Sequence, residues 1–344
     1  MLSIVDQART PNWSEDVRQA DWIARRLSGN WGTVLGVIPD GFEAYARVLH
    51  PVETPERGRD RLVRWRDVAE RSGMPLRHNS QYHSIALPPE RPATPGPDFG
   101  HGPRVGSLYS EDIRVLAEIG RRWTSTPELC WFCLWDGYGW NNMVFMVEHG
   151  ASAPPVPPDP IPDSVREGPK VRLPNRSYFV YSGPVEAGVA TFGLSDTEQS
   201  PNLWWPQDQS WCIATELDLE WTYVAGSAGM IDDILTDSRI EALPANPAEP
   251  INRIEDWVKD WIDTALRELM ETGQTSITTS MGTMEASIEM PSPPRQGSLS
   301  YRSTDLQGRT RQSGGQPLGI YNAEHMDRIA RSVLTKRIIA MAEF

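Results

Sequence analysis

The chain has 344 residues and a formal net charge of −13, from 33 Lys/Arg against 46 Asp/Glu. Hydrophobic residues make up 39% and charged residues 23%, which is a globular composition and excludes a disordered or fibrous chain. No apolar run approaches the roughly 18 residues of a membrane-spanning helix, and the N-terminus lacks the basic and apolar regions of a secretory signal. The acidic balance argues against binding to nucleic acid or to an anionic membrane.

In the first half of the chain, helices are predicted over residues 14–27, with Ser14 as the N-cap, and over residues 110–123, with Ser110 as the cap. A shorter helix is predicted over residues 61–72 and ends at Gly73. Residues 33–51 are typical of a strand, a Pro-Asp-Gly turn and a second strand. The first of these helices places Val17, Ala20, Trp22, Ile23 and Leu27 at roughly helical spacing.

Residues 128–140 and 177–185 are rich in aromatic and β-branched residues and are predicted to be strands. Between them, residues 150–164 carry six prolines and predict an extended surface loop. The first of these strands contains Cys130 and Cys133, whose spacing suits a redox pair or half of a zinc site. No second pair of ligands at zinc spacing accompanies them, so we interpret both as buried strand residues.

Three cysteines without a disulfide-scaffold spacing favour the reducing cytoplasm. The histidines are scattered, with His78 and His83 five residues apart in a loop-like segment. Neither the cysteines nor the histidines form a metal-binding motif. The sequence therefore predicts no metal ligand and no cofactor.

The segment WDGYGW, residues 135–140, places glycines between aromatic residues and a carboxylate. A hairpin tip is the favoured interpretation, because Gly supplies the backbone freedom that tight turns need. The alternative is a ligand-stacking site. Its candidate contacts are Asp136, Tyr138 and Trp140.

The segment from Pro201 to Ser227 holds four tryptophans and four carboxylates. From Trp211 to Val224 its residues alternate with a period of two, which predicts a strand with one buried and one solvated face. A turn near Glu216–Leu219 is compatible with the unusual length of this strand. Ser227 then begins a short helix.

The solvated side of this predicted strand carries Glu216, Asp218 and Glu220. We favour a solvated or partner-docking face. The alternative is catalytic, because carboxylates about 6.5–7 Å apart on a strand can serve as acid and base in glycoside hydrolysis. Trp204 and Trp205 would then supply an aromatic platform, and all five residues are candidate ligand or partner contacts.

Charge and tryptophan are unevenly distributed along the chain. Residues 291–344 carry a net charge of +4, so the first 290 residues are net −17, and 12 of the 14 tryptophans lie before residue 222. The proline-rich segment 243–250 disfavours helix and strand. We therefore predict a Trp-rich body over residues 1–248 and an appendage over residues 249–344.

The appendage begins with a helix over residues 252–273, in which Asn252 and Glu255 form a capping box. Residues 275–290 and 297–304 are then predicted as strands, residues 312–319 as a plain connection, and residues 322–342 as a second helix. The apolar stripe of the first helix is expected to dock on the body. The alternative is a homodimer joined through residues 252–272.

Several blocks of the chain resemble known families. The blocks VIPDGFEAYARVLHPV, CWFCLWDGYGW and LWWPQDQSWCIATELDLEWTYVAGS resemble an uncharacterised actinobacterial protein family, which implies no catalytic residue. The block IPDGFEAY is also similar to the SUKH immunity-protein superfamily. That resemblance implies a cytoplasmic α+β module that binds a toxin.

The expected fold is α+β, with a mixed or antiparallel sheet, flanking helices and a C-terminal helix-strand-strand-helix unit. The expected function is that of a non-enzymatic cytoplasmic module that binds another protein, as an immunity or conflict-system component. The alternative is a hydrolase of unfamiliar type that uses Glu216, Asp218 or Asp136.

Overall fold

The computed structural model describes residues 11–28, 32–56, 59–86, 102–137, 161–174, 176–189, 199–251, 256–279, 282–289, 297–305 and 310–319. The contacts within the chain group it into two compact units. Unit 1 comprises Met1–His50 with Arg104–Ile251, and unit 2 comprises Pro51–Pro103 with Asn252–Phe344. The predicted division after residue 248 stays a prediction. The two compact units divide the chain differently, because residues 51–103 belong to the same unit as the C-terminal segment.

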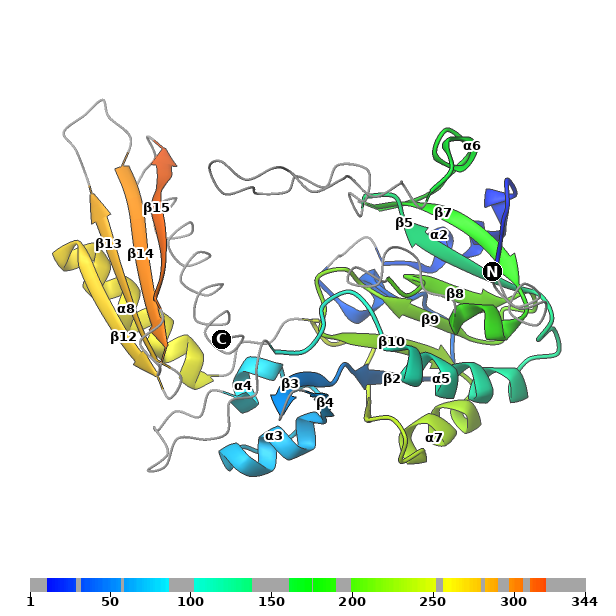
Figure 1. Ribbon diagram of the computed structural model, residues 1–344, viewed down its shortest axis with the longest axis horizontal. Helices are drawn as coiled ribbons and strands as arrows, with labels where there is room; N and C mark the ends of the chain where they lie inside the picture. Colours follow the sequence, from blue (N-terminus) through cyan, green and yellow to red (C-terminus); the bar gives the residue numbers. More distant parts are fainter. Residues whose placement is uncertain are drawn as a thin grey trace. The chain divides into compact units, whose positions relative to one another are not determined.

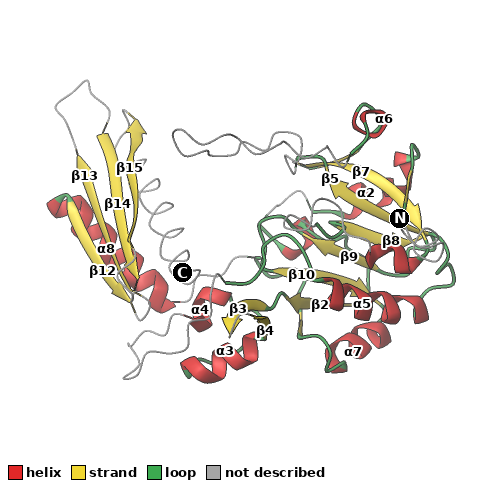
Figure 2. Cartoon of the chain, in the orientation of Figure 1, coloured by secondary structure: helices red, strands yellow, loops and turns green. Residues whose placement is uncertain are grey.

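Unit 1 is built on an antiparallel sheet with helices on its faces (Figures 1 and 2), which confirms the predicted α+β class. The described strands follow the order β1-β7-β5-β8-β9-β10-β2-β11, and β6 pairs with β7. They are β1 (Asn12–Trp13), β2 (Ala44–Leu49), β5 (Cys130–Trp135), β6 (Val171–Leu173), β7 (Arg176–Gly183), β8 (Leu203–Pro206), β9 (Cys212–Thr215), β10 (Trp221–Gly226) and β11 (Ala242–Pro244).

Short and long helices cover both faces of this sheet. They are η1 (Val17–Ala20), α2 (Asp21–Arg26), η2 (Val34–Gly36), α5 (Ser110–Arg122), α6 (Asp163–Arg166), η3 (Val185–Val189) and α7 (Ala228–Thr236). On one face of the sheet, side chains of α5 and α7 pack with side chains of the strands in one buried hydrophobic cluster. On the opposite face, Trp22 of α2 meets Trp205 of β8 edge-on, with ring centroids 6.1 Å apart.

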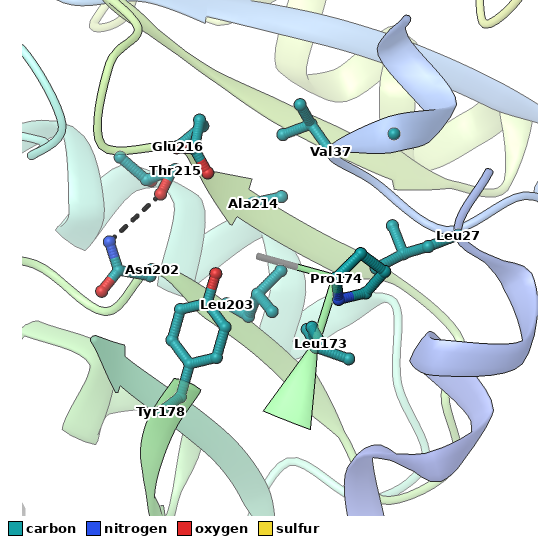
Figure 3. Close-up of a pocket in the computed structure, with 11 residues that line it drawn as sticks. Leu27, Val37, Leu173, Pro174, Tyr178, Asn202, Leu203, Ala214, Thr215 and Glu216 are labelled. Atoms are coloured by element: carbon teal, nitrogen blue, oxygen red, sulfur yellow. Dashed lines mark hydrogen bonds between the residues drawn. The ribbon is translucent and has the colours of Figure 1, made fainter. Parts of the chain in front are cut away.

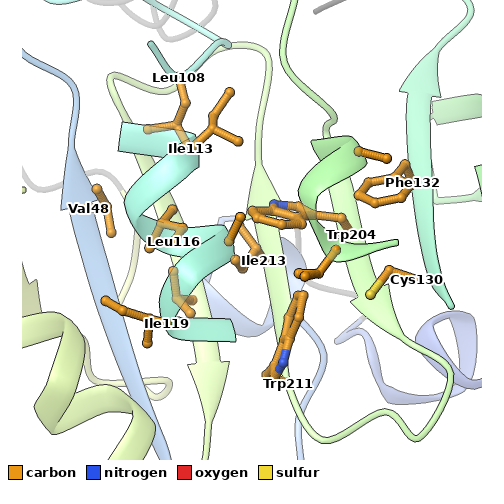
Figure 4. Close-up of a cluster of buried hydrophobic side chains, with 14 of the residues drawn as sticks. Val48, Leu108, Ile113, Leu116, Ile119, Cys130, Phe132, Trp204, Trp211 and Ile213 are labelled. Atoms are coloured by element: carbon orange, nitrogen blue, oxygen red, sulfur yellow. The ribbon is translucent and has the colours of Figure 1, made fainter. Parts of the chain in front are cut away.

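The main core lies between α5 and the sheet (Figure 4). Ile113, Leu116 and Ile119 recur at the spacing of one helix face and belong to one buried cluster with Trp204 and Trp211. The indole nitrogen of Trp211 donates to the Gly120 carbonyl at 3.0 Å. A Cβ at Gly120 would lie 2.9 Å from that indole, so the close approach of helix and strand requires glycine.

Because both faces are covered, the alternation from Trp211 to Val224 does not separate buried from solvated residues. All residues of β9 and β10 are buried. The prediction of one continuous strand with a solvated face is therefore wrong for this segment. The predicted turn is confirmed, since the N–H of Leu219 donates to the carbonyl of Glu216 at 3.1 Å.

Several predicted helices are confirmed. The helix over 110–122 is present, with Tyr109 at the N-cap and Ser110 as the first helical residue, which corrects the predicted cap. The helix α3 (Trp65–Ser72) ends at Gly73 in the left-handed conformation, as predicted, but it begins later than predicted because residues 61–63 belong to the strand Arg59–Val63. Ser227 caps α7 by accepting from the N–H of Met230 at 3.3 Å. Residues 34–36 differ from prediction, because they form a 3-10 turn in which Val34 and Gly36 are buried, and not a strand paired in the sheet.

Unit 2 contains a hairpin of β3 (Val52–Glu56) and β4 (Arg59–Val63), followed by α3 and α4 (Tyr82–Ala86). Its C-terminal part is α8 (Asp256–Thr272) with a four-stranded antiparallel sheet. The strands are β12 (Gln274–Thr279), β13 (Gly282–Glu289), β14 (Gly297–Asp305) and β15 (Thr310–Gly319), in that order. None of the described helices is both long and apolar enough to span a bilayer.

The C-terminal unit differs from the predicted helix-strand-strand-helix in its strands. The predicted strand over 275–290 is two strands, and the segment 312–319, predicted as a connection, belongs to β15. These strands are rich in Ser, Thr and Gly, so their alternation of apolar and polar residues is weak. The predicted last helix, residues 322–342, lies outside the described residues.

Candidate functional site

Glu216 lies at the start of the turn between β9 and β10 and is only 5% exposed. Its Oε1 accepts a hydrogen bond from Nη2 of Arg176, the first residue of β7, at 2.8 Å. The same nitrogen lies 3.1 Å from Oδ2 of Asp218, a residue whose side chain is 79% exposed. The two carboxylates that the sequence placed on one face therefore share one guanidinium, and we call these three residues the Arg176 cluster.

Burial raises the pKa of Glu216, and the nearby guanidinium of Arg176 opposes that rise without cancelling it. The structure corrects the prediction that this carboxylate is solvated, because the turn folds it back against β7. Asp218 is exposed as predicted. Glu220 is half-buried and does not join the cluster; its charge acts instead on the buried guanidinium of Arg47.

A narrow pocket lies beside Glu216 (Figure 3). One side is apolar, and the other carries the hydroxyl of Tyr178, the amide of Asn202 and the carboxylate of Glu216. The apolar side is formed by Leu27, Val37, Leu173, Pro174 and Leu203. Between its atoms the pocket encloses about 310 Å³, open solvent at its mouth included.

Asn202 fixes the polar end of this pocket. Its Nδ2 donates to the carbonyl of Thr215 at 3.2 Å, and its Oδ1 accepts from the N–H of Trp135 at 2.8 Å. These bonds join the ends of β5 and β9 on either side of β8. The polar atoms of Asn202 are thus used to hold strands together, which is a structural task.

A buried chain of hydrogen bonds begins at Thr215, the last residue of β9, which precedes Glu216 in the sequence. The hydroxyls of Thr215 and Thr222 lie 2.8 Å apart, and that of Thr222 lies 2.9 Å from Nε2 of His50. Nδ1 of His50 lies 2.6 Å from the carbonyl of Arg104, which can only accept, so Nδ1 carries the proton. Burial lowers the pKa of His50 to about 4. The imidazole is therefore neutral at physiological pH.

Gly106 holds the turn that carries Glu216 and Asp218. It adopts a φ of 74°, and its N–H donates to the carbonyl of Leu219 at 2.9 Å. A Cβ at this position would lie 2.6 Å from the carbonyl oxygen of Leu217. The turn of the Arg176 cluster can pack this closely only because residue 106 has no side chain.

Gly106→Ala is expected to lower the free energy of unfolding by about 2 kcal/mol, roughly half from the left-handed backbone and half from displacement of the turn. Gly73→Ala is the matched control, because Gly73 has a φ of 71° but nothing within 4 Å of an added Cβ. Urea denaturation of both variants separates the two contributions. Equal losses in the two variants would show that the turn is not packed on Gly106.

Asp136, at the end of β5, does not join the Arg176 cluster. Its Oδ2 pairs with Nζ of Lys170 at 3.1 Å, and that ammonium lies 5.0 Å from the ring centroid of Phe179. Phe179 belongs to the buried cluster on the α5 face of the sheet, whereas Glu216 lines the pocket on the other face. Tyr138 and Trp140 lie outside the described residues.

Trp204 and Trp205 are core residues, each 1% exposed. Trp204 stacks near Phe132 on one face of the sheet, and Trp205 packs against Trp22 on the other. Neither indole can form the ligand platform or partner contact that the sequence allowed, because successive strand residues point into two covered faces. The aromatic richness of this segment builds the core.

The interpretation of the cysteines as buried strand residues is confirmed. Cys130, Cys133 and Cys212 are free and buried, and burial raises the pKa of Cys130 to about 12. Thiols with a raised pKa are poor nucleophiles and poor metal ligands. Within the described ranges, no group of three His, Cys, Asp or Glu side chains is placed to hold a metal ion.

A second, wider site is an open groove in unit 1, which encloses about 910 Å³ with open solvent at its mouth included. It is lined by the segment Asp40–Tyr45 except Gly41, by α7 and by the end of β11 with the segment that follows it. The lining residues are Asp40, Phe42, Glu43, Ala44, Tyr45, Ala228, Ile231, Asp232, Leu235, Pro244, Ala245 and Pro247. We call this set the α7 groove.

The α7 groove has an apolar floor and an acidic rim. Ile231 is buried, and Phe42 and Leu235 are half-buried, so apolar surface faces the opening. Three exposed carboxylates, Asp40, Glu43 and Asp232, stand around it. This combination can take an apolar side chain together with positive charge.

The sequence reasoning missed Arg176 and the α7 groove. Arg176 stands before an apolar strand, where nothing in the local pattern marks it as a partner for residues 40 positions away. The groove joins three separate segments, and the sequence predicts a turn in the first and a helix in the second without indicating that they meet. The hydrogen bonds of His50 likewise come from Thr222 and Arg104, both distant in the sequence.

Both carboxylates of the Arg176 cluster are paired with Arg176, whereas the carboxylates of the α7 groove face solvent. No protein-family model, no curated protein and no solved structure matches the chain.

Proposed function

We propose that this chain is a non-enzymatic cytoplasmic protein-binding module that receives a segment of its partner in the α7 groove. The observation that supports the proposal is the open apolar floor of the groove, around Phe42, Ile231 and Leu235, within an acidic rim. Apolar surface rimmed by polar residues is typical of interaction sites. Such a surface would otherwise favour nonspecific association.

The segment that lines one wall of the groove, Asp40–Tyr45, lies within the block IPDGFEAY. This is the block that is similar to the SUKH immunity-protein superfamily. The resemblance implies that the partner is a toxin and that the chain is an immunity or conflict-system component. That role is part of the proposal.

The geometry gives less support to a hydrolase. Arg176 holds Glu216 and Asp218 together, so neither carboxylate is free of a cationic partner. Asp136 pairs with Lys170 elsewhere. A general acid and base would need a substrate between them, and the narrow pocket beside Glu216 places apolar side chains there.

A homodimer through residues 252–272 is a separate arrangement that the experiments should test. Ala265, Leu266 and Leu269 of α8 are buried within unit 2, and α8 packs against β12 and β13. Part of the predicted apolar stripe is thus covered by the chain itself. Sedimentation at two protein concentrations tells whether the remainder joins two copies.

Site-specific photocrosslinking tests the proposed docking surface. A benzophenone amino acid at Leu235, in the full chain expressed in its native host, is expected to give one discrete crosslinked product on irradiation. The matched control places the same group at Leu129, which is 40% exposed and outside the groove. Ala228→Arg, which puts a long side chain at the groove, is expected to reduce the Leu235 product at least about tenfold, the equivalent of ~1.4 kcal/mol.

Products of equal yield at Leu235 and Leu129 would mean nonspecific capture and would contradict the proposal. The absence of any product at Leu235 would contradict it as well. A product that survives Ala228→Arg would show that the partner does not enter the groove. Mass spectrometry of the crosslinked peptide identifies the partner segment.

A further inference from the structure

The rim of the α7 groove carries three carboxylates that are not paired with a described cation. Asp40, Glu43 and Asp232 form no ion pair with any described residue. Arg26 lies close to this rim, since its Nη1 would lie 3.6 Å from a Cβ on Gly41, and its guanidinium lies 5.4 Å from the ring centroid of Trp22. The rim therefore keeps a net negative charge even when this arginine is counted.

Two other acidic residues, one in α7 and one just after it, are paired with arginines. Asp233 accepts from Arg122 at 3.0 Å and from the indole of Trp123 at 2.8 Å. Asp237 pairs with Arg239 at 2.8 Å, at the end of the same helix. Asp232, the neighbour of Asp233, is exposed and lines the groove, so the unpaired carboxylate of this helix lies at the groove.

Two of the rim carboxylates are held in place by backbone N–H groups instead of cations. Oε2 of Glu43 accepts from the N–H of Ala228, the first residue of α7, at 2.9 Å. Oδ1 of Asp40 accepts from the N–H of Gly41 at 2.7 Å. A backbone donor fixes the orientation of a carboxylate but leaves its charge available to a ligand.

The apolar floor is also preorganised. The ring of Phe42 meets those of Trp22 and Tyr45 edge-on, with centroids 6.2 and 6.4 Å away. Pro244 and Pro247 restrict the backbone of the opposite wall. A floor that is already ordered costs little conformational entropy when a side chain enters it.

The backbone of the groove disfavours addition of a partner strand. β11 is the edge strand of the sheet next to the groove, and it ends at Pro244, which has no N–H to donate. A partner segment must then bind through its side chains. The acidic rim also repels nucleic-acid phosphates.

We infer that the α7 groove binds a short cationic protein segment in which Lys or Arg residues flank one large apolar residue. The apolar residue enters between Phe42 and Leu235, and the cations meet Asp40, Glu43 and Asp232. This inference rests on the proposed protein-binding function and specifies the chemistry of the partner at that site.

Selection from a phage-displayed library of random 12-residue peptides tests this assignment, with the full chain as the target. Enriched peptides are expected to carry at least two Lys or Arg around a Leu, Phe or Trp. A synthetic copy of the most enriched peptide is then titrated by fluorescence anisotropy. Its Kd is expected to rise about tenfold in the triple variant Asp40→Asn, Glu43→Gln, Asp232→Asn, from three exposed charge pairs of about 0.5 kcal/mol each.

The matched control removes the same charge outside the groove, by Glu15→Gln, Glu111→Gln and Glu167→Gln, all exposed positions of unit 1. It is expected to change the Kd less than about twofold, as screened distant charges should. Leu235→Ala is expected to weaken binding about tenfold through lost apolar contact. Circular dichroism confirms that each variant is folded.

The outcomes separate the inference from the proposed function. Peptides that are acidic or neutral, or whose Kd is unchanged by the triple variant, but that are lost on Leu235→Ala, would overturn the inference and leave the groove as a docking surface. Peptides that bind equally well to the Leu235→Ala variant, or a selection that yields none, would overturn both.

Discussion

Replacing Arg176 by methionine is expected to lower the free energy of unfolding at pH 7.5 by about 3 kcal/mol, because it leaves the buried carboxylate of Glu216 without its cation. Glu216 is 5% exposed and lies 2.8 Å from the guanidinium. Methionine keeps much of the length of the arginine stem, so the cost of lost packing is small. Urea denaturation followed by tryptophan fluorescence measures the loss.

The loss should depend on pH with a definite sign. Burial already raises the pKa of Glu216, and removal of Arg176 raises it further. A carboxylate whose pKa is higher in the folded state than in the unfolded chain binds more protons when folded, so the penalty grows as pH rises. The difference between wild type and Arg176→Met should therefore shrink from pH 7.5 to pH 4.5.

Glu216→Gln is the matched control for this prediction. Glutamine keeps an oxygen that can accept from Arg176, and the guanidinium retains Asp218, so the loss should be no more than about 1 kcal/mol. A fully solvated Glu216 would instead make both variants as stable as wild type. That result would return this carboxylate to the surface role predicted from sequence.

Between pH 7.5 and pH 4.5, His50 is expected to remove about 2.5 kcal/mol from the free energy of unfolding. Its pKa is lowered to about 4 by burial, with a further contribution from the charge of Arg104. The unfolded chain has the ordinary value of about 6.5 and binds a proton first as pH falls. Stability from this residue is complete above about pH 6.5 and is lost progressively toward pH 4.

His50→Gln removes the titration while keeping polar atoms for Thr222 and for the carbonyl of Arg104. Glutamine forms these hydrogen bonds with poorer geometry, which lowers the free energy of unfolding at every pH. The informative quantity is therefore the slope of the free energy of unfolding against pH. We expect that slope to be shallower than in wild type over pH 4.5–7.5. Parallel curves for the two proteins would show that His50 is not a buried neutral imidazole.

The sequence predicts a feature correctly where one short segment contains all the residues that determine it. The α5 helix follows from apolar residues at helical spacing, α7 from a serine cap, and the end of α3 from Gly73. The cysteines of β5 follow from an apolar run without partner ligands. In each case the energetics depend on residues within about one or two turns of each other.

The prediction of a solvated strand face failed because the burial of that face depends on other elements that pack over the sheet. The alternation around Glu216 is real, but α2 and η2 cover the face that would otherwise be wet. Periodicity reports which side chains share a face and carries no information about what covers that face. The same limit applies to Trp204 and Trp205, which were candidates for contacts and are core residues.

The prediction of the strands of unit 2 failed for another reason. Segments such as Thr310–Gly319 contain few apolar residues, so a strand there is stabilised by hydrogen bonds to β14 more than by its own pattern. Propensity for β-structure is set largely by neighbours across the sheet. A single sequence does not show those neighbours.

The sequence by itself determined the α+β class, the acidic balance, the positions of the main helices and the burial of the cysteines, because short-range spacing fixes each of these. Only the tertiary structure decided that Arg176 reaches Glu216 and Asp218, and that Asp40–Tyr45, α7 and residues 244–247 enclose one groove. The physical reason is distance along the chain. Coulombic attraction, burial and groove shape depend on where residues far apart in sequence meet in space, and that is set by the packing of the whole sheet.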